Sequence, residues 1–333
     1  MPTFCSKLLL ALVGGCWAIT SAAHAVHHND VQHRAAPTTA ATSNAGGSSI
    51  DELLQRYSVQ GDDALLERAE QRLASARDRV GAHALLQQAW LAQAQHDFDR
   101  ASALTAQLLR LQPGNGQAWL LEAALAAVMA DRERGRAACG RVTLTVSPVA
   151  GITCFASLTR TRDEQLRAYE RLQALPTDKL GDNLLAWHWS VHAQLAQALG
   201  LYTAAERYWR LSIDRFPALQ ARAALVDLLI QTQRPAQALE LLGSDETTPA
   251  LAVRRLIVLQ QLDKDVATRV ASTDEQFQQW LAAGDFRHAR EMAMFYLDVV
   301  PRSRLAFLAA SENVKIQREP EDLAILARAR EGV

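Results

Sequence analysis

The residues of this sequence best suited to metal chemistry are histidines close to its N-terminus. His27, His28 and His33 lie in a short polar stretch, and cleavage after Ala25 would leave Val26-His27-His28 at the new N-terminus. A free amine with histidine in third place binds Cu(II) or Ni(II) through the amine, two backbone amides and the imidazole, because these metals accept square-planar nitrogen sites. The stretch predicts a Cu or Ni site with His33 as a further ligand. The alternative is an ordinary polar linker that happens to contain histidines.

A second histidine pair, His188 and His192, is spaced four residues apart and therefore lies on one face of a helix. Such a pair is able to bind a metal. The zinc protease signature requires a glutamate directly after the first histidine, and this chain has Trp189 there. No third ligand stands at a fixed spacing, so we expect a solvated or packed histidine pair.

Two cysteines are positioned to form a disulfide. Of the four cysteines, Cys5 and Cys16 fall within the N-terminal leader, which leaves Cys139 and Cys154. Two remaining thiols in an exported protein tend to pair. We therefore expect a Cys139–Cys154 bridge, with two buried and unreactive thiols as the alternative.

Residues 1–25 have the pattern of a signal peptide. Lys7 supplies the positive start, Leu8 to Thr20 form an apolar run too short to span a membrane comfortably, and Ala23-His24-Ala25 is a cleavage site. The pattern predicts a periplasmic or secreted protein, with no transmembrane segment after cleavage. The letters "LVGGC", which end at Cys16, loosely resemble a bacterial lipobox, so a lipid anchor on Cys16 is the alternative.

The rest of the chain divides into a linker and a helical region. Residues 26–49 are small and polar without apolar periodicity, which predicts a disordered, His-rich linker. In residues 50–331, apolar positions recur every three or four residues, as in "DALLERAEQRLASA". Glycine and proline interrupt these runs, so we expect a string of short helices. The only strand-like segment is "VTLTV" at 142–146.

Neither charge nor motifs point to nucleic acid or to catalysis. The formal net charge is −1 and no basic stripe is present, which argues against a nucleic-acid partner. The sequence contains no nucleophile elbow, phosphate loop or dinucleotide fingerprint. Asp163 and Glu164 suit the positive end of a helix dipole better than acid–base work. We expect a non-enzymatic protein.

Three segments place the same residue types in one register. Each has a central alanine, an aromatic residue three positions before it and a proline twelve positions after it: Phe98, Ala101 and Pro113; Tyr202, Ala205 and Pro217; Phe286, Ala289 and Pro301. Alanine lets two helices approach closely, the aromatic ring fills the space beside the contact, and proline ends the second helix.

The register also has irregularities. Ala101 and Ala205 are 104 residues apart, whereas Ala205 and Ala289 are 84 residues apart, which is not a whole number of 34-residue periods. We therefore expect a shortened or distorted unit between residues 243 and 273. Five positions before the central alanine, two copies have glycine (Gly200 and Gly284) and the first has His96. Twelve positions before it, two copies have alanine (Ala89 and Ala193) and the third has Phe277.

The segment "AWHWSVHAQLAQALGLYTAAERYWRLSIDRFP" resembles the tetratricopeptide repeat family, and "GQAWLLEAALAAVMA" is similar to the opening of another copy. The resemblance covers most of residues 51–331. It implies an all-α, right-handed α-solenoid of stacked helix-turn-helix repeats, with about eight helix pairs at a 34-residue period. It also implies a concave side, lined by the first helix of each pair, that binds a partner.

The resemblance predicts which side chains face that concave side. They are Leu86, Trp90, Gln93, Trp187, Ser190, Gln194 and Gln197. Tryptophan is a frequent anchor at interfaces, and glutamine amides are able to hydrogen-bond an extended peptide. The alternative is that Trp90 and Trp187 pack between neighbouring helices.

These observations lead to two hypotheses of different classes. The first is an exported scaffold that binds a protein or peptide in the cell envelope, with an outer-membrane-associated partner as one possibility. The second is a metal-handling accessory protein, whose histidine arm captures Cu, Ni or Zn while the helical region docks to a transporter or metalloprotein.

The copper hypothesis predicts a visible d–d absorption band when Cu(II) is added to a peptide that begins at Val26. The band should saturate near one equivalent, and a peptide with His28→Ala should not form it, since the third-position imidazole completes the square-planar site. Absence of a band near stoichiometry would exclude the site.

Overall fold

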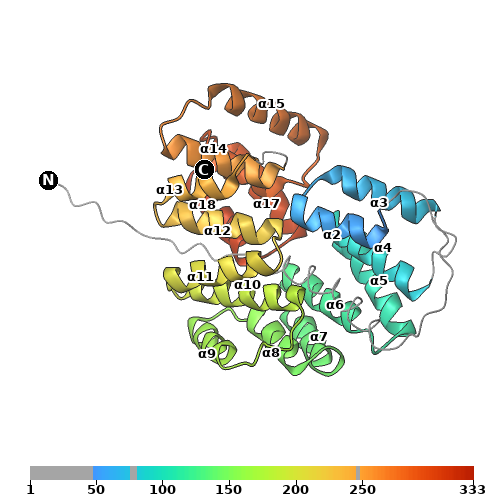
Figure 1. The fold of residues 1–333 in the computed structure, drawn as a ribbon. Coiled ribbons are helices and arrows are strands. Elements are labelled where there is room, and N and C mark those ends of the chain that lie inside the picture. The colour runs from blue at the N-terminus through green and yellow to red at the C-terminus, as the bar shows by residue number, and fades with distance from the viewer. Residues whose placement is uncertain (1–47, 76–80, 245–247) are drawn as a thin grey trace.

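The computed structural model describes residues 48–75, 81–244 and 248–333, and these ranges are helices joined by turns (Figure 1). The helices within them, in chain order, are α2 Ile50–Gln60, α3 Asp63–Ser75, α4 Ala82–Ala94, α5 Phe98–Leu111, α6 Gly116–Val128, α7 Arg132–Thr145, α8 Pro148–Ser157, α9 Arg162–Gln173, α10 Asp182–Ala198, α11 Tyr202–Arg215, α12 Leu219–Gln231, α13 Pro235–Leu242, α14 Pro249–Gln261, α15 Ala267–Ala283, α16 Ala289–Asp298, α17 Ser303–Ile316 and α18 Pro320–Glu331. No strand occurs in the described ranges. No helix there is both long and apolar enough to cross a bilayer.

The helices alternate between two layers. The even-numbered helices form the inner layer, which lines the concave side, and the odd-numbered helices form the outer layer. Most even-numbered helices form a hairpin with the odd-numbered helix that follows, and even-numbered helices also pack on one another, as α12 does on α14 and α16 on α18. The described residues therefore contain seven such hairpins, while α14 packs on α12, α13 and α16 and α18 packs on α16 and α17. The expected all-α solenoid of stacked helical hairpins is confirmed.

Small residues allow the two layers to approach each other. Ala89 and Ala101 are fully buried in α4 and α5, and Ala193 and Ala205 are fully buried in α10 and α11. A larger side chain at such a position would force the helices apart or out of their preferred rotamers. These alanines are the ones that the sequence register singles out.

The turns inside several hairpins share one backbone conformation even where their residue types differ. His96, Ala130, Gly200 and Gln233 all have left-handed φ angles, of 62, 60, 80 and 58°. Only glycine adopts this conformation without steric cost, and other residues lose about 1–2 kcal/mol. The spacing between His96 and Ala130 is one 34-residue period, so the repeat is preserved in the backbone where glycine is absent.

The third copy of the sequence register is out of phase with the other two, which corrects the expectation that all three are equivalent. Ala101 and Ala205 lie in the outer helices α5 and α11, whereas Ala289 begins the inner helix α16. The 84-residue spacing between Ala205 and Ala289 is about two and a half 34-residue periods. Because one period contains one inner and one outer helix, a shift by half a period places the matching residues in a helix of the other layer.

The irregular unit expected between residues 243 and 273 ends in α15, a helix that lies apart from the array (Figure 1). Phe277 is its only buried residue and contacts the Phe295 ring of α16 edge-on, with 5.3 Å between ring centroids. A phenylalanine where the other copies have alanine keeps the two backbones apart, because its ring occupies the space between them.

The strand-like segment at 142–146 is helical up to Thr145, which corrects that expectation. It forms the end of α7, where Val142 is fully buried. The Thr143 hydroxyl donates to the Cys139 carbonyl at 2.9 Å, one turn earlier in the helix. Tertiary packing and these bonds outweigh the preference of β-branched residues for strands.

The expected Cys139–Cys154 disulfide is present and joins α7 to α8. Both cysteines are fully buried, and their Cα atoms are 5.4 Å apart. A bridge that closes a loop of this size stabilises the folded state by about 3 kcal/mol in the chain-entropy treatment. Beside it, Gly151 of α8 lies so close to Thr143 that a Cβ atom would be 2.7 Å from the Thr143 Cα.

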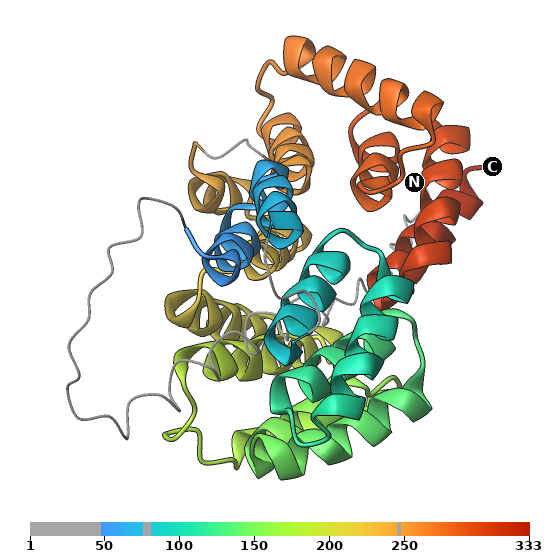
Figure 2. The ribbon, with the colours of Figure 1, turned by 90° about the vertical axis from the view of Figure 1, so that its right-hand side faces the viewer.

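The array curls until its first hairpin meets its later part (Figure 2). Helix α2 packs on α12, and Gly61 at its end faces Leu219 and Thr248 so closely that it has no room for a side chain. His288, which precedes α16, lies 3.6 Å from the Asp63 carboxylate at the start of α3. The inner face of the solenoid is therefore largely enclosed by the chain itself.

The contact between α7 and α8 predicts that Gly151→Ala destabilises the protein. The added methyl group meets Thr143, and overpacking of this kind costs about 1–3 kcal/mol. Gly140→Ala in α7, where a Cβ atom meets nothing within 4 Å, is the matched control. It should raise the unfolding free energy by about 0.5–1 kcal/mol through helix propensity. Urea unfolding measures both, and equal behaviour of the two variants would refute the close approach.

Candidate functional site

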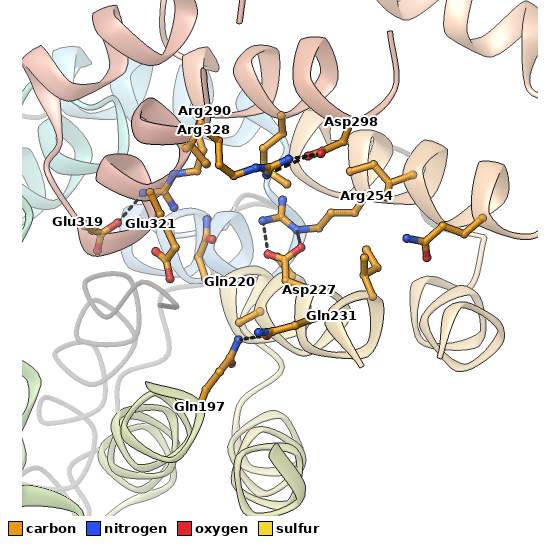
Figure 3. Close-up of a pocket in the computed structure, with 18 of the residues that line it drawn as sticks. Gln197, Gln220, Asp227, Gln231, Arg254, Arg290, Asp298, Glu319, Glu321 and Arg328 are labelled. Atoms are coloured by element: carbon orange, nitrogen blue, oxygen red, sulfur yellow. Dashed lines mark hydrogen bonds and ion pairs between the residues drawn. The ribbon is translucent and has the colours of Figure 1, made fainter. Parts of the chain in front are cut away.

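A cavity of about 570 Å³ opens on the inner face of the described part of the chain. It lies between the inner helices α10, α12, α14 and α16 and the final helix α18 (Figure 3). Pockets of this size hold drug-sized ligands or a few side chains of a bound segment. Its apolar wall comprises Ala223, Ala224, Ile230, Ile257, Met294, Ala324 and Ile325.

One side of the cavity carries an ion pair between α12 and α14, in which Arg254 is buried and Asp227 is half-buried. The Arg254 guanidinium donates to both oxygens of Asp227, from Nε at 2.8 Å and from Nη2 at 2.7 Å. Burial by itself would lower the pKa of Arg254, but the Asp227 carboxylate outweighs it and the pKa is raised. The pair is bidentate, the geometry in which arginine binds carboxylates most strongly.

The opposite side carries a denser network that attaches α18. Arg290 of α16 donates from Nε to Asp322 and from Nη2 to Glu319, both at 2.7 Å. Asn313 of α17 donates to the same Asp322 at 2.6 Å, and Glu319 caps the N-terminus of α18. The side chain of Asp322 is fully buried. Two carboxylates buried this deeply depend on the single guanidinium for charge compensation.

Glu321 differs from its neighbours in the cavity because its carboxylate has no partner. Both of its oxygens are buried, and neither makes a hydrogen bond to any described residue. Burial raises the pKa of Glu321 well above its usual range; Arg290 opposes this, while Glu319 and Asp322 add to it. An ionisable group in this setting is a frequent mark of a ligand site.

Glutamine amides form the third part of the cavity wall. Gln197 donates to the Gln231 side chain at 3.2 Å, and Gln231 donates in turn to the Tyr202 hydroxyl at 3.3 Å. Gln220, from the first turn of α12, lies beside Glu321 (Figure 3). Amide groups offer both donors and acceptors, so this wall suits a ligand with a peptide-like backbone.

The structure buries most of the side chains that were expected on the concave surface. Only Gln197 borders the main cavity, and Gln194 borders a smaller one of about 180 Å³. The other five are at most 6% exposed, namely Leu86, Trp90, Gln93, Trp187 and Ser190. Their expected placement on an open surface is therefore corrected, and the tryptophans pack between helices as the alternative stated.

The reason is the burial of the inner helices on all sides. In α4, nearly every residue from Ala84 to Ala94 is buried, because neighbouring helices cover its whole circumference. Ser190 of α10 lies 2.8 Å from Ser212 of α11 and bonds the Ala186 carbonyl, so it belongs to the contact within a hairpin. A solenoid that curls this tightly has no open trough along α4.

The pair His188 and His192 is packed, in agreement with the non-metal interpretation. The His192 ring stacks on Tyr208 with 4.0 Å between centroids, and His188 Nδ1 lies 3.0 Å from the Thr153 hydroxyl. Burial lowers the pKa of His188 to about 4 and that of His192 to about 3. Among the described residues, no group of three or more His, Cys, Asp or Glu side chains is placed to hold a metal.

The N-terminal metal ligands proposed from the sequence, His27, His28 and His33, lie outside the described residues. So do residues 1–25 and nearly all of the linker at 26–49. The copper or nickel site and the signal peptide therefore stay predictions.

Sequence reasoning missed the charged residues of the cavity. Arg254 gave one signal, because it interrupts an apolar helix in "ALAVRRLIVL". Glu321 gave none, since "EPEDL" has the composition of an ordinary exposed helix start. Its burial follows from the curl of the array, which brings α18 against the inner helices.

Comparison with known proteins gives a likeness in structure. No protein-family model matches the sequence, and no curated protein matches it. Among solved structures, the chain is similar to a tetratricopeptide repeat protein from Parabacteroides merdae, at 15% identity and a TM-score of 0.40. That likeness covers 85% of this chain and all of the other one.

The network at α18 predicts that Arg290→Met strongly destabilises the protein. Removing the guanidinium leaves the Asp322 and Glu319 carboxylates buried and uncompensated, a change that costs about 3–5 kcal/mol. Arg287→Met is the matched control, because Arg287 pairs with Asp285 at an exposed site. Loss of such a surface pair changes stability by about 1 kcal/mol or less. Equal urea midpoints for the two variants would contradict the assigned role of Arg290.

Proposed function

We propose that this protein is a non-enzymatic, exported scaffold that binds an extended segment of a partner protein in the inner cavity. The observation that carries the proposal is the cavity itself, about 570 Å³ with an apolar floor and glutamine amides on one wall. Apolar side chains of a segment would pack on the floor, and the amides would bond its backbone.

The charges around the cavity favour holding a ligand over transforming it. Arg254 and Arg290 each bond carboxylates of the chain, and Arg328 pairs with Asp298. Arginines engaged in this way position helices and are not available to stabilise a developing negative charge. What remains for a ligand is an apolar surface, amides and the Glu321 carboxylate.

Export to the periplasm, or secretion, is part of the proposal. It is supported by the signal-peptide pattern of residues 1–25 and by the buried disulfide, since such bonds persist in oxidising compartments. A lipid anchor on Cys16 is the alternative for the same compartment.

The metal-handling alternative depends on the N-terminal arm that would begin at Val26 and that carries His27, His28 and His33. Deleting residues 26–34 separates it from the scaffold hypothesis. Partner binding in the cavity persists in that deletion if the protein is a scaffold, whereas a function linked to copper, nickel or zinc disappears with the arm.

Photocrosslinking tests the cavity in the native host. With p-benzoylphenylalanine at position 220, on the cavity wall, we expect one discrete adduct with another protein. The same group at position 144, where Leu144 is 77% exposed on α7, is the matched control and should not form that adduct. Identical adducts from both positions, or none from position 220, would show that the cavity is not the binding site.

A further inference from the structure

The carboxyl group of Glu321 lines the cavity without a hydrogen-bond partner among the described residues. Its neighbours on α18 are bound by the chain, since Glu319 and Asp322 both accept hydrogen bonds from Arg290. Glu321 lines the cavity, and its two buried oxygens accept no hydrogen bond from any described residue. Figure 3 shows its side chain among the residues that line the cavity, beside Gln220.

The charges that line the cavity do not balance. Each arginine is engaged: Arg254 with Asp227, Arg328 with Asp298, and Arg290 with Glu319 and Asp322. Glu321 therefore adds a buried carboxyl group for which this part of the chain offers no hydrogen-bonded cation. An ionised carboxylate without a partner in a buried setting is strongly unfavourable, and a cation brought by a ligand would remove that cost.

We propose that Glu321 recognises an arginine or lysine side chain of the partner segment that enters the cavity. This assignment rests on the proposed function and gives the partner its chemistry: a basic residue flanked by apolar ones. The basic group pairs with the Glu321 carboxylate, while neighbouring side chains pack on Ala224, Ile257 and Met294.

A polypeptide segment fits the cavity better than a free polyamine. Most of the surface around Glu321 is apolar, and a polyamine has no groups that gain from burial there. The amides of Gln220 and Gln231 offer donors and acceptors at the same time, which matches a peptide backbone. An arginine side chain also brings a long apolar stem behind its charged end.

The titration of Glu321 gives the pairing a measurable signature. The raised pKa reflects burial and the nearby carboxylates Glu319, Asp322 and Asp227, which together outweigh the opposing charge of Arg290. A bound cation favours the ionised form of Glu321 and lowers its pKa. Binding therefore releases protons, and affinity should rise with pH until Glu321 is ionised in the free protein.

Calorimetric titration with capped tripeptides tests the pairing on the full chain. The probes are N-acetyl-Leu-Arg-Leu amide and the same peptide with citrulline, which keeps the shape of arginine without its charge. We expect the arginine peptide to bind at least tenfold more tightly, since charge-assisted hydrogen bonds are about twice as strong as neutral ones. Glu321→Gln should abolish the difference, whereas Glu331→Gln at the exposed end of the same helix should leave it unchanged.

Each outcome decides the assignment. Because Glu321→Gln replaces a buried acidic group that has no hydrogen-bond partner with a neutral side chain of the same shape, its melting temperature should equal or exceed that of the parent protein, so lost binding is not unfolding. Equal binding of the two peptides, no binding of either, or binding of spermidine in place of both would overturn the proposal. If the photocrosslinked adduct at position 220 persists unchanged in Glu321→Gln, the proposed recognition of a basic residue is wrong and the scaffold function stands. If no adduct forms in the parent protein either, the proposed scaffold function is wrong as well.

Discussion

The whole architecture depends on the close approach of two helix layers at alanine. Ala89, Ala101, Ala193 and Ala205 are fully buried where an inner helix meets its outer partner. Because each hairpin is held by such a contact, the next hairpin finds a regular surface on which to stack. In α15, where the sequence register has phenylalanine at position 277 in place of that alanine, this ring is the only buried residue. The position of the cavity follows from the same contacts, since they fix where the inner helices run.

Ion pairs between successive inner helices complete the cavity. Arg254 of α14 bonds Asp227 of α12, and Arg290 of α16 bonds Asp322 of α18. Each pair spans two inner helices that come one after the other, so the pairs set the relative position of the cavity walls. Buried pairs of this kind add little net stability over apolar contacts, but breaking one is costly. In this protein the ion pairs fix the relative positions of the helices that surround the cavity, and the space between those helices remains largely apolar.

The helices and the disulfide could be predicted from the sequence, whereas the solvent exposure of individual side chains could not. The helices, the pairing in hairpins and the Cys139–Cys154 bridge follow from periodicity, spacing and compartment, which are local or chemical properties. The assignment of Trp90 and Trp187 to an open groove was wrong, because exposure depends on how far the array curls. Curl accumulates from small rotations at every hairpin and leaves no residue pattern of its own. For the same reason Glu321, in an unremarkable helix start, gave no sign of its burial.

Two contacts alter how the ends of the array should unfold. They are the packing of α2 on α12 and the ion pair between Asp63 and His288. An open stack of repeats frays from its ends, since terminal units have only one neighbour. Here the first hairpin has a second neighbour far along the chain, so the linear stack becomes a nearly closed loop. Opening the loop requires loss of the contacts between the first hairpin and the later helices. Because α12 both packs on α2 and lines the cavity, motions of the first hairpin are coupled to the cavity wall.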